Sequence, residues 1–319
     1  MKISEILAQS TKPYPSIEIV PPLRGITKHE LLESIAPFMD FSPKYINVTS
    51  HRDEFEYREE ADGSFSKHLI RNRINETTVC AAIMSEYDVE VVPHLICGGV
   101  TKEEIECKLD NLAFMGINNI VALRGDSMKG EKRFTPTPGG YSHASDLVEG
   151  IRSYKGSSAY KRSSGLSESD RFFCIGVGAY PEKHFEAANM ETDILNLKKK
   201  VDAGSDYIIT QMFFDNKVYY DFVEKCRAAG ITVPIIPGLK PLSTARQISV
   251  LPEAFSLDIP VELTAEIEAA KGNKEAIYAI GTEWCTMQCK DLLKNNVPAV
   301  HFYTMGKADN IVKILKECF

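Results

Sequence analysis

Eight short apolar runs recur along the 319-residue chain, and most of them precede a stretch in which apolar positions return with helical spacing. The runs are rich in Val, Ile, Phe and Tyr, as expected of strands that are buried on both faces of a sheet. They cover residues 17–20, 45–49, 90–95, 119–126, 172–180, 207–214, 233–239 and 299–304. Eight strand–helix units in one chain predict an α/β fold of the (β/α)8 TIM-barrel class.

Helix signals separate these runs. Thr27 and Thr101 are each followed three residues later by Glu, so capping boxes are expected to open helices over 26–39 and 101–116. Amphipathic spacing predicts further helices over 144–154, 190–204, 216–230 and 308–319. The long segment between the seventh and eighth strands, 243–295, predicts extra helices.

We expect one catalytic domain that spans residues 1–319, because an eight-unit barrel uses nearly the whole chain. Residues 127–141 form a Pro- and Gly-containing loop after the fourth strand, in a position typical of a lid or binding loop. Residues 153–171 are Ser-rich and polar, which predicts a mobile insertion before the fifth strand.

Composition narrows the class of protein. A formal net charge of −7 disfavours nucleic acid as a partner, and no apolar run reaches membrane-spanning length. The N-terminus lacks a signal-peptide core, and the eight Cys show no CxxC spacing, so we expect free thiols in a reducing cytoplasm. A metal or redox pair at Cys285 and Cys289 is the alternative.

The familiar catalytic signatures are missing from the sequence. It contains no GxGxxG, GxxxxGK[ST], HExxH or GxSxG motif, and its seven His show no metal-ligand spacing. A dinucleotide, if bound, is therefore not held by a Rossmann turn, and no metal site is expected.

Polar residues instead gather at the C-terminal ends of the predicted strands, which meet at one mouth of a barrel. Glu18 lies inside an apolar strand, where desolvation favours the protonated form that a general acid needs. The alternative is a Glu that pairs with a buried cation or faces a polar layer of the barrel. Asp126 ends ALRGD and could place a carboxylate beside a cofactor ring, or it could serve only as a turn residue.

Three further groups are candidates for ligand contacts. Tyr180 and His184 in AYPEKH could stack on a bound ring, or form an ordinary loop. Gln211 in ITQMFF could recognise a flat heterocycle, or satisfy backbone groups. Asp193, Asn196 and Lys200 form a polar helix stripe that could grip a diphosphate, or simply face solvent.

Taken in order, nine segments resemble the methylenetetrahydrofolate reductase family over almost the whole chain. They are IEIVPP, VTSHRD, PHLIC, ALRGD, HASDLV, VGAYPEKH, TDILNLKKKVDAGSDYIITQMFFD, IIPGLKPLS and HFYTM. The resemblance, to a bacterial-type catalytic domain, implies the same eight-stranded barrel. It also implies a flavoenzyme that uses FAD and either NADH or NADPH to reduce 5,10-methylenetetrahydrofolate to 5-methyltetrahydrofolate in a ping-pong scheme that feeds methionine synthesis.

The resemblance also implies residue roles. Glu18 would be the acid that protonates the folate ring, Asp126 the carboxylate near flavin and pterin, and Gln211 a substrate-binding amide. Tyr303 and Lys307 are expected to join Gln211 in binding substrate. The positions that match FAD contacts are Thr49, His94, Arg124, Gly125, Asp126, Ala144, Tyr180, His184, Asp193, Asn196, Lys199 and Lys200.

Three positions depart from the better-known bacterial pattern. Ala245 stands near a position that is often aromatic, Lys307 near one that is often Arg, and His143 where Tyr is common. The missing aromatic raises an alternative, a related flavoprotein subunit that a partner electron carrier reduces. Partners are otherwise expected to be small molecules, folate and a nicotinamide dinucleotide, and the family resemblance implies a homo-oligomer.

Overall fold

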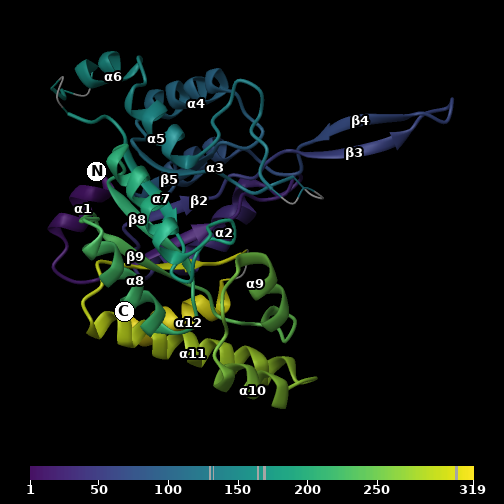
Figure 1. Cartoon of the computed structure of the whole chain (residues 1–319), viewed down its shortest axis with the longest axis vertical. Helices are drawn as coiled ribbons and strands as arrows, with labels where there is room; N and C mark the ends of the chain where they lie inside the picture. The colour runs from purple at the N-terminus through teal and green to yellow at the C-terminus, as the bar shows by residue number, and fades with distance from the viewer. Residues whose placement is uncertain (129–130, 132, 164, 168–169, 306–307) are drawn as a thin grey trace.

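In the computed structural model, which describes residues 1–128, 131, 133–163, 165–167, 170–305 and 308–319, eight parallel strands close into a barrel (Figure 1). The barrel strands, in their order around the barrel, are β1 (Pro15–Ile19), β10 (Val300–Tyr303), β9 (Ile235–Leu239), β8 (Tyr207–Met212), β7 (Cys174–Ala179), β6 (Asn119–Leu123), β5 (Glu90–Ile96) and β2 (Tyr45–Val48). Each corresponds to one predicted run, so the TIM-barrel class is confirmed. Polar residues predicted to end the strand over 119–126 lie beyond β6, in the following loop.

Helices cover the outside of the barrel. They are α2 (Lys28–Met39), α3 (Glu76–Met84), α4 (Lys102–Phe114), α5 (Ala144–Arg152), α7 (Met190–Asp202), α8 (Asn216–Ala228) and α12 (Asp309–Cys318). The capping boxes at Thr27 and Thr101 are both present, so these predicted starts are confirmed. Helix α3 was not predicted. On α7, Ile194 and Leu197 are buried, as the predicted stripe requires.

The predicted extra helices between β9 and β10 are α9 (Gln247–Phe255), α10 (Val261–Ala269) and α11 (Lys274–Lys294). They enclose an apolar cluster of their own, in which Leu251, Leu263 and Ile277 pack beneath Met212 and Phe214 at the end of β8. This cluster fixes the extra helices to the same end of the barrel as the strand C-termini.

The opposite end is closed by a helix that the sequence patterns did not reveal, α1 (Ile3–Gln9). Its buried Ile3 and Ile6 pack on Tyr45 and Tyr207 inside the barrel. The buried backbone N–H of Ile3 donates to Oδ1 of Asn119 at 2.9 Å. With this end filled, a ligand can reach the barrel interior only from the other mouth.

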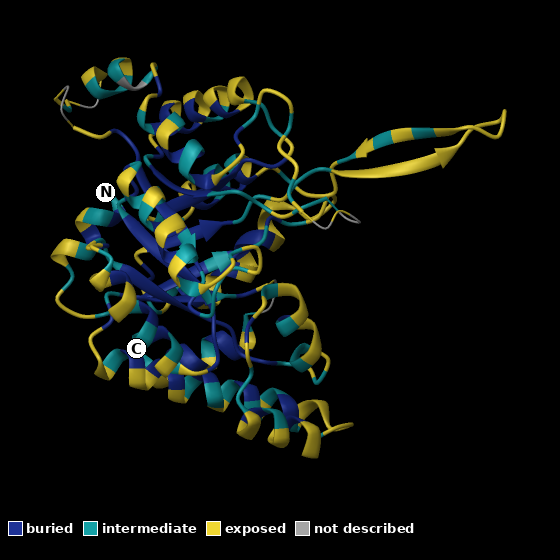
Figure 2. Ribbon diagram, viewed as in Figure 1, coloured by how far each residue is buried: buried dark blue, intermediate teal, exposed yellow. Residues whose placement is uncertain are grey.

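Two other elements depart from a minimal barrel. The antiparallel strands β3 (Glu54–Glu59) and β4 (Phe65–Ile70) form a separate hairpin that projects far from the body and is largely exposed (Figure 2). Within the Ser-rich segment 153–171, the structure describes a short helix, α6 (Ser157–Ser163), although a mobile insertion was predicted. Its mobility stays a prediction.

Inside the barrel, close packing fixes where the upper side chains lie. A Cβ atom on Gly238 would lie 2.6 Å from the Tyr303 ring and would also meet the carbonyl oxygen of Thr210. Only glycine leaves room there for Tyr303, whose hydroxyl donates to the Thr210 carbonyl at 2.6 Å. All eight cysteines lie in the described chain as free thiols. Among the described residues, no helix has the length and apolarity to cross a membrane.

Candidate active site

A polar layer crosses the barrel just below its open mouth. The Glu18 carboxylate on β1 lies 3.5 Å from Nε2 of His301 and 3.8 Å from Nε2 of His94. The His301 Nδ1 lies 3.0 Å from the Ser16 hydroxyl, and Asn47 donates to that hydroxyl at 3.2 Å. Three strands that are adjacent in the barrel, β10, β1 and β2, thereby fix the position of one acidic group.

The two imidazoles differ in their surroundings. Burial lowers the pKa of His94 to about 4, against the opposing effect of the nearby Glu18 charge. His94 is therefore neutral near pH 7, and its Nε2 lies 3.3 Å from Oδ1 of Asn47. His301 Nε2 is buried and makes no hydrogen bond within the described chain. It is thus available to the Glu18 carboxyl.

Asp126 follows β6 in the loop that borders the mouth. It comes after Gly125, whose φ of +82° favours glycine and whose added Cβ would lie 3.2 Å from the Ile96 side chain. The exposed Asp126 carboxylate acts electrostatically on Tyr180 from the next strand: burial, with a smaller contribution from Asp126, raises the pKa of Tyr180 to about 12. Asp126 and Tyr180 therefore face the same space.

The Arg124 side chain already contacts other residues of the protein. Its guanidinium forms an ion pair with Glu186 and lies 5.1 Å above the ring of Phe134, which belongs to the loop that was predicted as a lid or binding loop. The Glu186 backbone N–H donates to Nδ1 of His184 at 3.1 Å. A phosphate at this position would thus meet an arginine that the β7–α7 loop already orients.

The β7–α7 loop also orders its aromatic residues. The His184 ring meets the Tyr180 ring edge-on at 4.7 Å, and the His184 backbone N–H donates to Asp193 of α7 at 2.8 Å. Burial lowers the pKa of His184, and the Arg124 charge lowers it further. The structure thus brings Tyr180, His184 and Asp193 together, as the ligand-binding hypothesis requires.

The three other predicted α7 positions separate into two groups. Lys200 donates to the carbonyl oxygen of Gly178 at 2.8 Å, and burial lowers its pKa to about 8. Lys199 and Asn196 are exposed and contact each other at 3.3 Å. Lys200 is therefore built into the barrel end, whereas Lys199 and Asn196 can reach only a ligand that extends over the rim.

On β8, which pairs with β7, Gln211 is half-buried near the C-terminal end of the strand. Its Oε1 accepts the backbone N–H of Met212 at 2.9 Å, so the amide nitrogen is oriented by that contact. The Tyr303 ring meets His301 edge-on at 4.8 Å. Tyr303 on β10 thus lies level with Glu18 on β1, whereas Gln211 lies on β8, three strands from β1 around the barrel.

The remaining predicted positions lie around the rim or outside the described residues. Thr49 continues β2, and its hydroxyl lies 3.0 Å from Nε2 of His51. Ala144 is buried at the first position of α5. Lys307 falls in the part of the chain that the structure does not describe.

Several residues of this site were missed by sequence reasoning. His301, Asn47 and Ser16 each stand as a polar residue within an apolar strand, which is the same signal that singled out Glu18. His51 and Arg52 follow β2. The Arg52 side chain lies against Gly98 and Gly99, and its Nη1 is buried with no hydrogen-bond partner among the described residues.

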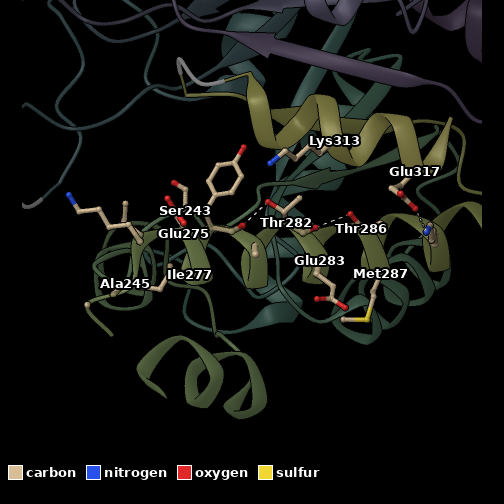
Figure 3. A pocket seen from close by; sticks show the side chains of 16 residues that line it. Ser243, Ala245, Glu275, Ile277, Thr282, Glu283, Thr286, Met287, Lys313 and Glu317 are labelled. Carbon is tan, nitrogen blue, oxygen red and sulfur yellow. Dashed lines mark hydrogen bonds and ion pairs between the residues drawn. The ribbon is translucent and has the colours of Figure 1, made fainter. Parts of the chain in front are cut away.

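A cavity of about 1180 Å³ lies away from this layer, along α11 (Figure 3). Ala245, Ile277 and Tyr278 line it, with Lys313 of α12 lying 4.8 Å from the centre of the Tyr278 ring. None of the titratable residues of the polar layer borders it. Because it lacks them, we place the candidate active site at the barrel mouth.

Comparisons with known proteins match nearly the whole chain to one family. A family model described as methylenetetrahydrofolate reductase matches residues 2–318. Methylenetetrahydrofolate reductase (NADH) 1 of Arabidopsis thaliana is 31% identical over 98% of this chain and 49% of its own length. The chain thus spans about half the length of that relative. The 5,10-methylenetetrahydrofolate reductase of Salmonella typhimurium is 32% identical over 92% of this chain and 86% of its own length.

A solved structure supports the fold alone. An uncharacterized protein from Clostridium thermocellum, which binds two copies of 5-methyl-5,6,7,8-tetrahydrofolic acid, superposes with a TM-score of 0.61. The match covers 99% of this chain and 98% of the other, at 13% sequence identity.

Proposed function

The chain belongs to the methylenetetrahydrofolate reductase family, and from this membership we propose that it is an FAD-dependent reductase of 5,10-methylenetetrahydrofolate. The electron donor would be NADH or NADPH, and the product 5-methyltetrahydrofolate would feed methionine synthesis. One observation carries the proposal: a single carboxyl group, Glu18, is held at the barrel mouth between His94 and His301.

The donor set at the mouth fits FAD. Arg124, His184 and Lys200 offer cationic or hydrogen-bonding groups suited to a diphosphate, and Lys199 extends this set over the rim. The buried, unpartnered Nη1 of Arg52 is a further donor beside the Gly98–Gly99 turn. Bound FAD would supply the hydride carrier, taking a hydride from reduced nicotinamide and giving it to the methylene carbon of folate.

Glu18 supplies the proton that the folate half-reaction needs. The five-membered ring of the substrate must open to an iminium before it can accept hydride, and opening requires protonation at a ring nitrogen. His94, whose pKa burial lowers to about 4, adds no positive charge beside the Glu18 carboxyl near pH 7. His301, fixed by Ser16, sets the direction in which the Glu18 carboxyl points.

Asp126, Gln211 and Tyr303 would complete the substrate site. The Asp126 carboxylate would disfavour negative charge on a flavin ring bound beside it, which would lower the flavin potential and favour hydride donation. Gln211 offers an amide to the flat pterin, and Tyr303 closes the space beside His301. Thr49 and Ala144 would contact the cofactor from β2 and α5.

A second candidate follows from Ala245, which packs against the α9–α11 cluster and offers no ring to a nicotinamide. In that case a partner electron carrier would reduce the flavin. The two candidates share the folate half-reaction and differ only in the donor. Action as a homo-oligomer in the cytoplasm is part of the proposal in either case.

The visible spectrum of the purified protein tests this function. Under the proposal, flavin bands bleach when NADH or NADPH is added without oxygen and return when methylenetetrahydrofolate follows. Flavin bands that stay unchanged with NADH and NADPH but bleach with reduced ferredoxin would favour the second candidate, in which a partner electron carrier reduces the flavin. A protein that binds no FAD would contradict both.

A further inference from the structure

The two helices that flank β10 bring three cysteines together. Cys285 and Cys289 lie one turn apart on α11, and Cys318 is the last residue of α12. Cys285 and Cys289 are buried, whereas Cys318 is half-buried. None of the three takes part in the proposed folate reduction, so the cluster needs an explanation of its own.

The packing of α12 on α11 places Cys318 against Cys289. Lys290 donates to Glu317 at 2.9 Å, so the residues next to both cysteines are in direct contact. The Cys318 thiol donates to the carbonyl oxygen of Thr286 at 3.9 Å, within one turn of Cys289 on α11. The Cys289 and Cys318 thiols also hydrogen-bond to each other. The two sulfur atoms are therefore neighbours in the reduced protein.

The sequence spacing singles out Cys285 as the partner of Cys289, and the structure favours Cys318 instead. Residues four apart on a helix have Cβ atoms about 5–6 Å apart, whereas a disulfide requires roughly 3.5–4.5 Å. Cys285 and Cys289 could therefore be joined only by distorting α11. A metal site is not supported either, because no group of three His, Cys, Asp or Glu among the described residues is arranged to hold an ion.

The two thiols differ in reactivity, because the thiolate is the nucleophile. The hydrogen bond from Cys289 lowers the pKa of Cys318, and the Lys290 charge lowers it further, while burial and the Glu317 charge oppose this. The same hydrogen bond, together with burial, raises the pKa of Cys289. A partly exposed thiol of lowered pKa beside a second thiol is the arrangement of redox-sensing cysteine pairs.

The thiol pair also lies beside the cavity along α11. Thr286, Lys290 and Glu317 line this cavity of about 1180 Å³ (Figure 3). Thr286 contacts Cys318, and the other two residues are the chain neighbours of Cys289 and Cys318. The cavity therefore gives a small oxidant an approach to the surroundings of Cys318.

We propose that Cys289 and Cys318 form a reversible disulfide when the protein meets a peroxide. The Cys318 thiolate attacks one peroxide oxygen, the O–O bond breaks, and the other oxygen leaves with the thiol proton as water, which gives a sulfenic acid on Cys318. The Cys289 sulfur then attacks the Cys318 sulfur, and the hydroxyl group leaves as water with the Cys289 proton. Two thiols and one hydrogen peroxide thus give one disulfide and two waters, and a dithiol reverses the reaction.

The disulfide would close a covalent ring that contains β10. This strand carries His301, which lies 3.5 Å from the Glu18 carboxylate, and Tyr303, which is level with Glu18. Because a cross-link restricts the unfolded chain, we expect the disulfide to raise the Tm on the order of 5 °C. The oxidised form would therefore keep the closing seam of the barrel intact under peroxide stress.

Intact-protein mass spectrometry of the full chain, before and after a small excess of hydrogen peroxide, tests the disulfide. We expect the mass to fall by two hydrogen atoms, peptide mapping to join Cys289 to Cys318, and dithiothreitol to reverse both changes. Thermal unfolding of the oxidised protein should show the rise in Tm. Cys107, which is exposed on α4, reports background oxidation in the same sample.

Three variants assign the roles. Cys318→Ser should abolish the cross-link, and Cys289→Ala should instead gain oxygen at Cys318. Cys285→Ala removes the third thiol of the cluster and is the matched control, which should form the cross-link as wild type does. Wild type that keeps both thiols, or a cross-link that joins Cys285 to Cys289 or one chain to another, would overturn the proposal. Because these measurements need neither flavin nor folate, failure here is distinct from failure of the proposed reductase function.

Discussion

The Glu18 carboxylate lies 3.5 Å from Nε2 of His301, although the two residues stand near opposite ends of the sequence. The contact exists because β1 pairs with β10 where the barrel closes, with Glu18 level with Tyr303. His301 is in turn anchored through Nδ1 to Ser16 on β1. The closing seam of the barrel thus positions the proposed acid.

We expect His301→Gln to slow the folate half-reaction by about tenfold to a hundredfold, because a small misplacement of an acid costs rate. Reduction of the flavin by nicotinamide should stay at the wild-type rate. Ser16→Ala, which leaves the ring but removes its anchor, should have a smaller effect in the same direction. Stopped-flow measurement of the two half-reactions checks this, and an equal loss in both would indicate a merely structural role for His301.

His94 makes the folded protein sensitive to acid. Burial lowers its pKa to about 4 in the folded state from 6.5, so the unfolded chain binds more protons between those values. Stability from this group is complete above pH 6.5 and is lost as pH falls toward 4, on the order of 3 kcal/mol in total. Urea unfolding at several pH values should show His94→Gln to be less acid-sensitive than wild type; parallel profiles would contradict the assignment.

Glu182, at the start of the β7–α7 loop, has the opposite effect on how folding stability depends on pH. Its carboxylate accepts the backbone N–H of Asp258 at 2.9 Å, and burial raises its pKa to about 7. The folded state therefore holds this proton more tightly, and stability from this group falls as pH rises from 4.5 to 7. Glu182→Gln should be more stable than wild type at pH 8 and no more stable at pH 4.5, as measured by thermal unfolding.

Lys200 should make FAD binding depend on pH. Because burial lowers its pKa to about 8, its positive charge is present below pH 8 and lost above it. The FAD dissociation constant should then rise with pH, by up to about tenfold per unit. Flavin fluorescence titration should show a flatter profile for Lys200→Met. Lys198→Met removes an α7 lysine that pairs with Asp202 instead, and it should keep the wild-type pH dependence.

The barrel strands were predictable because burial on both faces leaves a continuous apolar signature in each of them. The elements that were missed are short, or their apolar residues alternate in a different pattern from those of the barrel strands. The hairpin alternates in steps of two around Asp62–Gly63, a turn pair typical of hairpins, and this signal was present in the sequence. Helix α1 is only seven residues long and became recognisable through its contacts with the barrel floor.

The site was predictable in part. Glu18 stands out because a carboxylate within an apolar strand needs an explanation. Tyr180 and Asp193 stand out from the polar residues that follow the fifth strand, whereas Arg124 followed from the family resemblance. The pairing of Glu18 with His301 could not be predicted from the sequence, since the register of β1 against β10, where the barrel closes, depends on the packing of the whole barrel. Likewise, nothing local to Arg124 in the sequence indicates that Glu186 pairs with it.

The central claim is that Glu18 supplies the proton for folate reduction. Anaerobic stopped-flow measurement of both half-reactions in Glu18→Gln, beside wild type, tests it most directly. The account predicts flavin reduction by nicotinamide at the wild-type rate, and reoxidation by methylenetetrahydrofolate slowed by about 10² to 10⁴. Reoxidation at the wild-type rate would show that another group delivers the proton, and would contradict the claim.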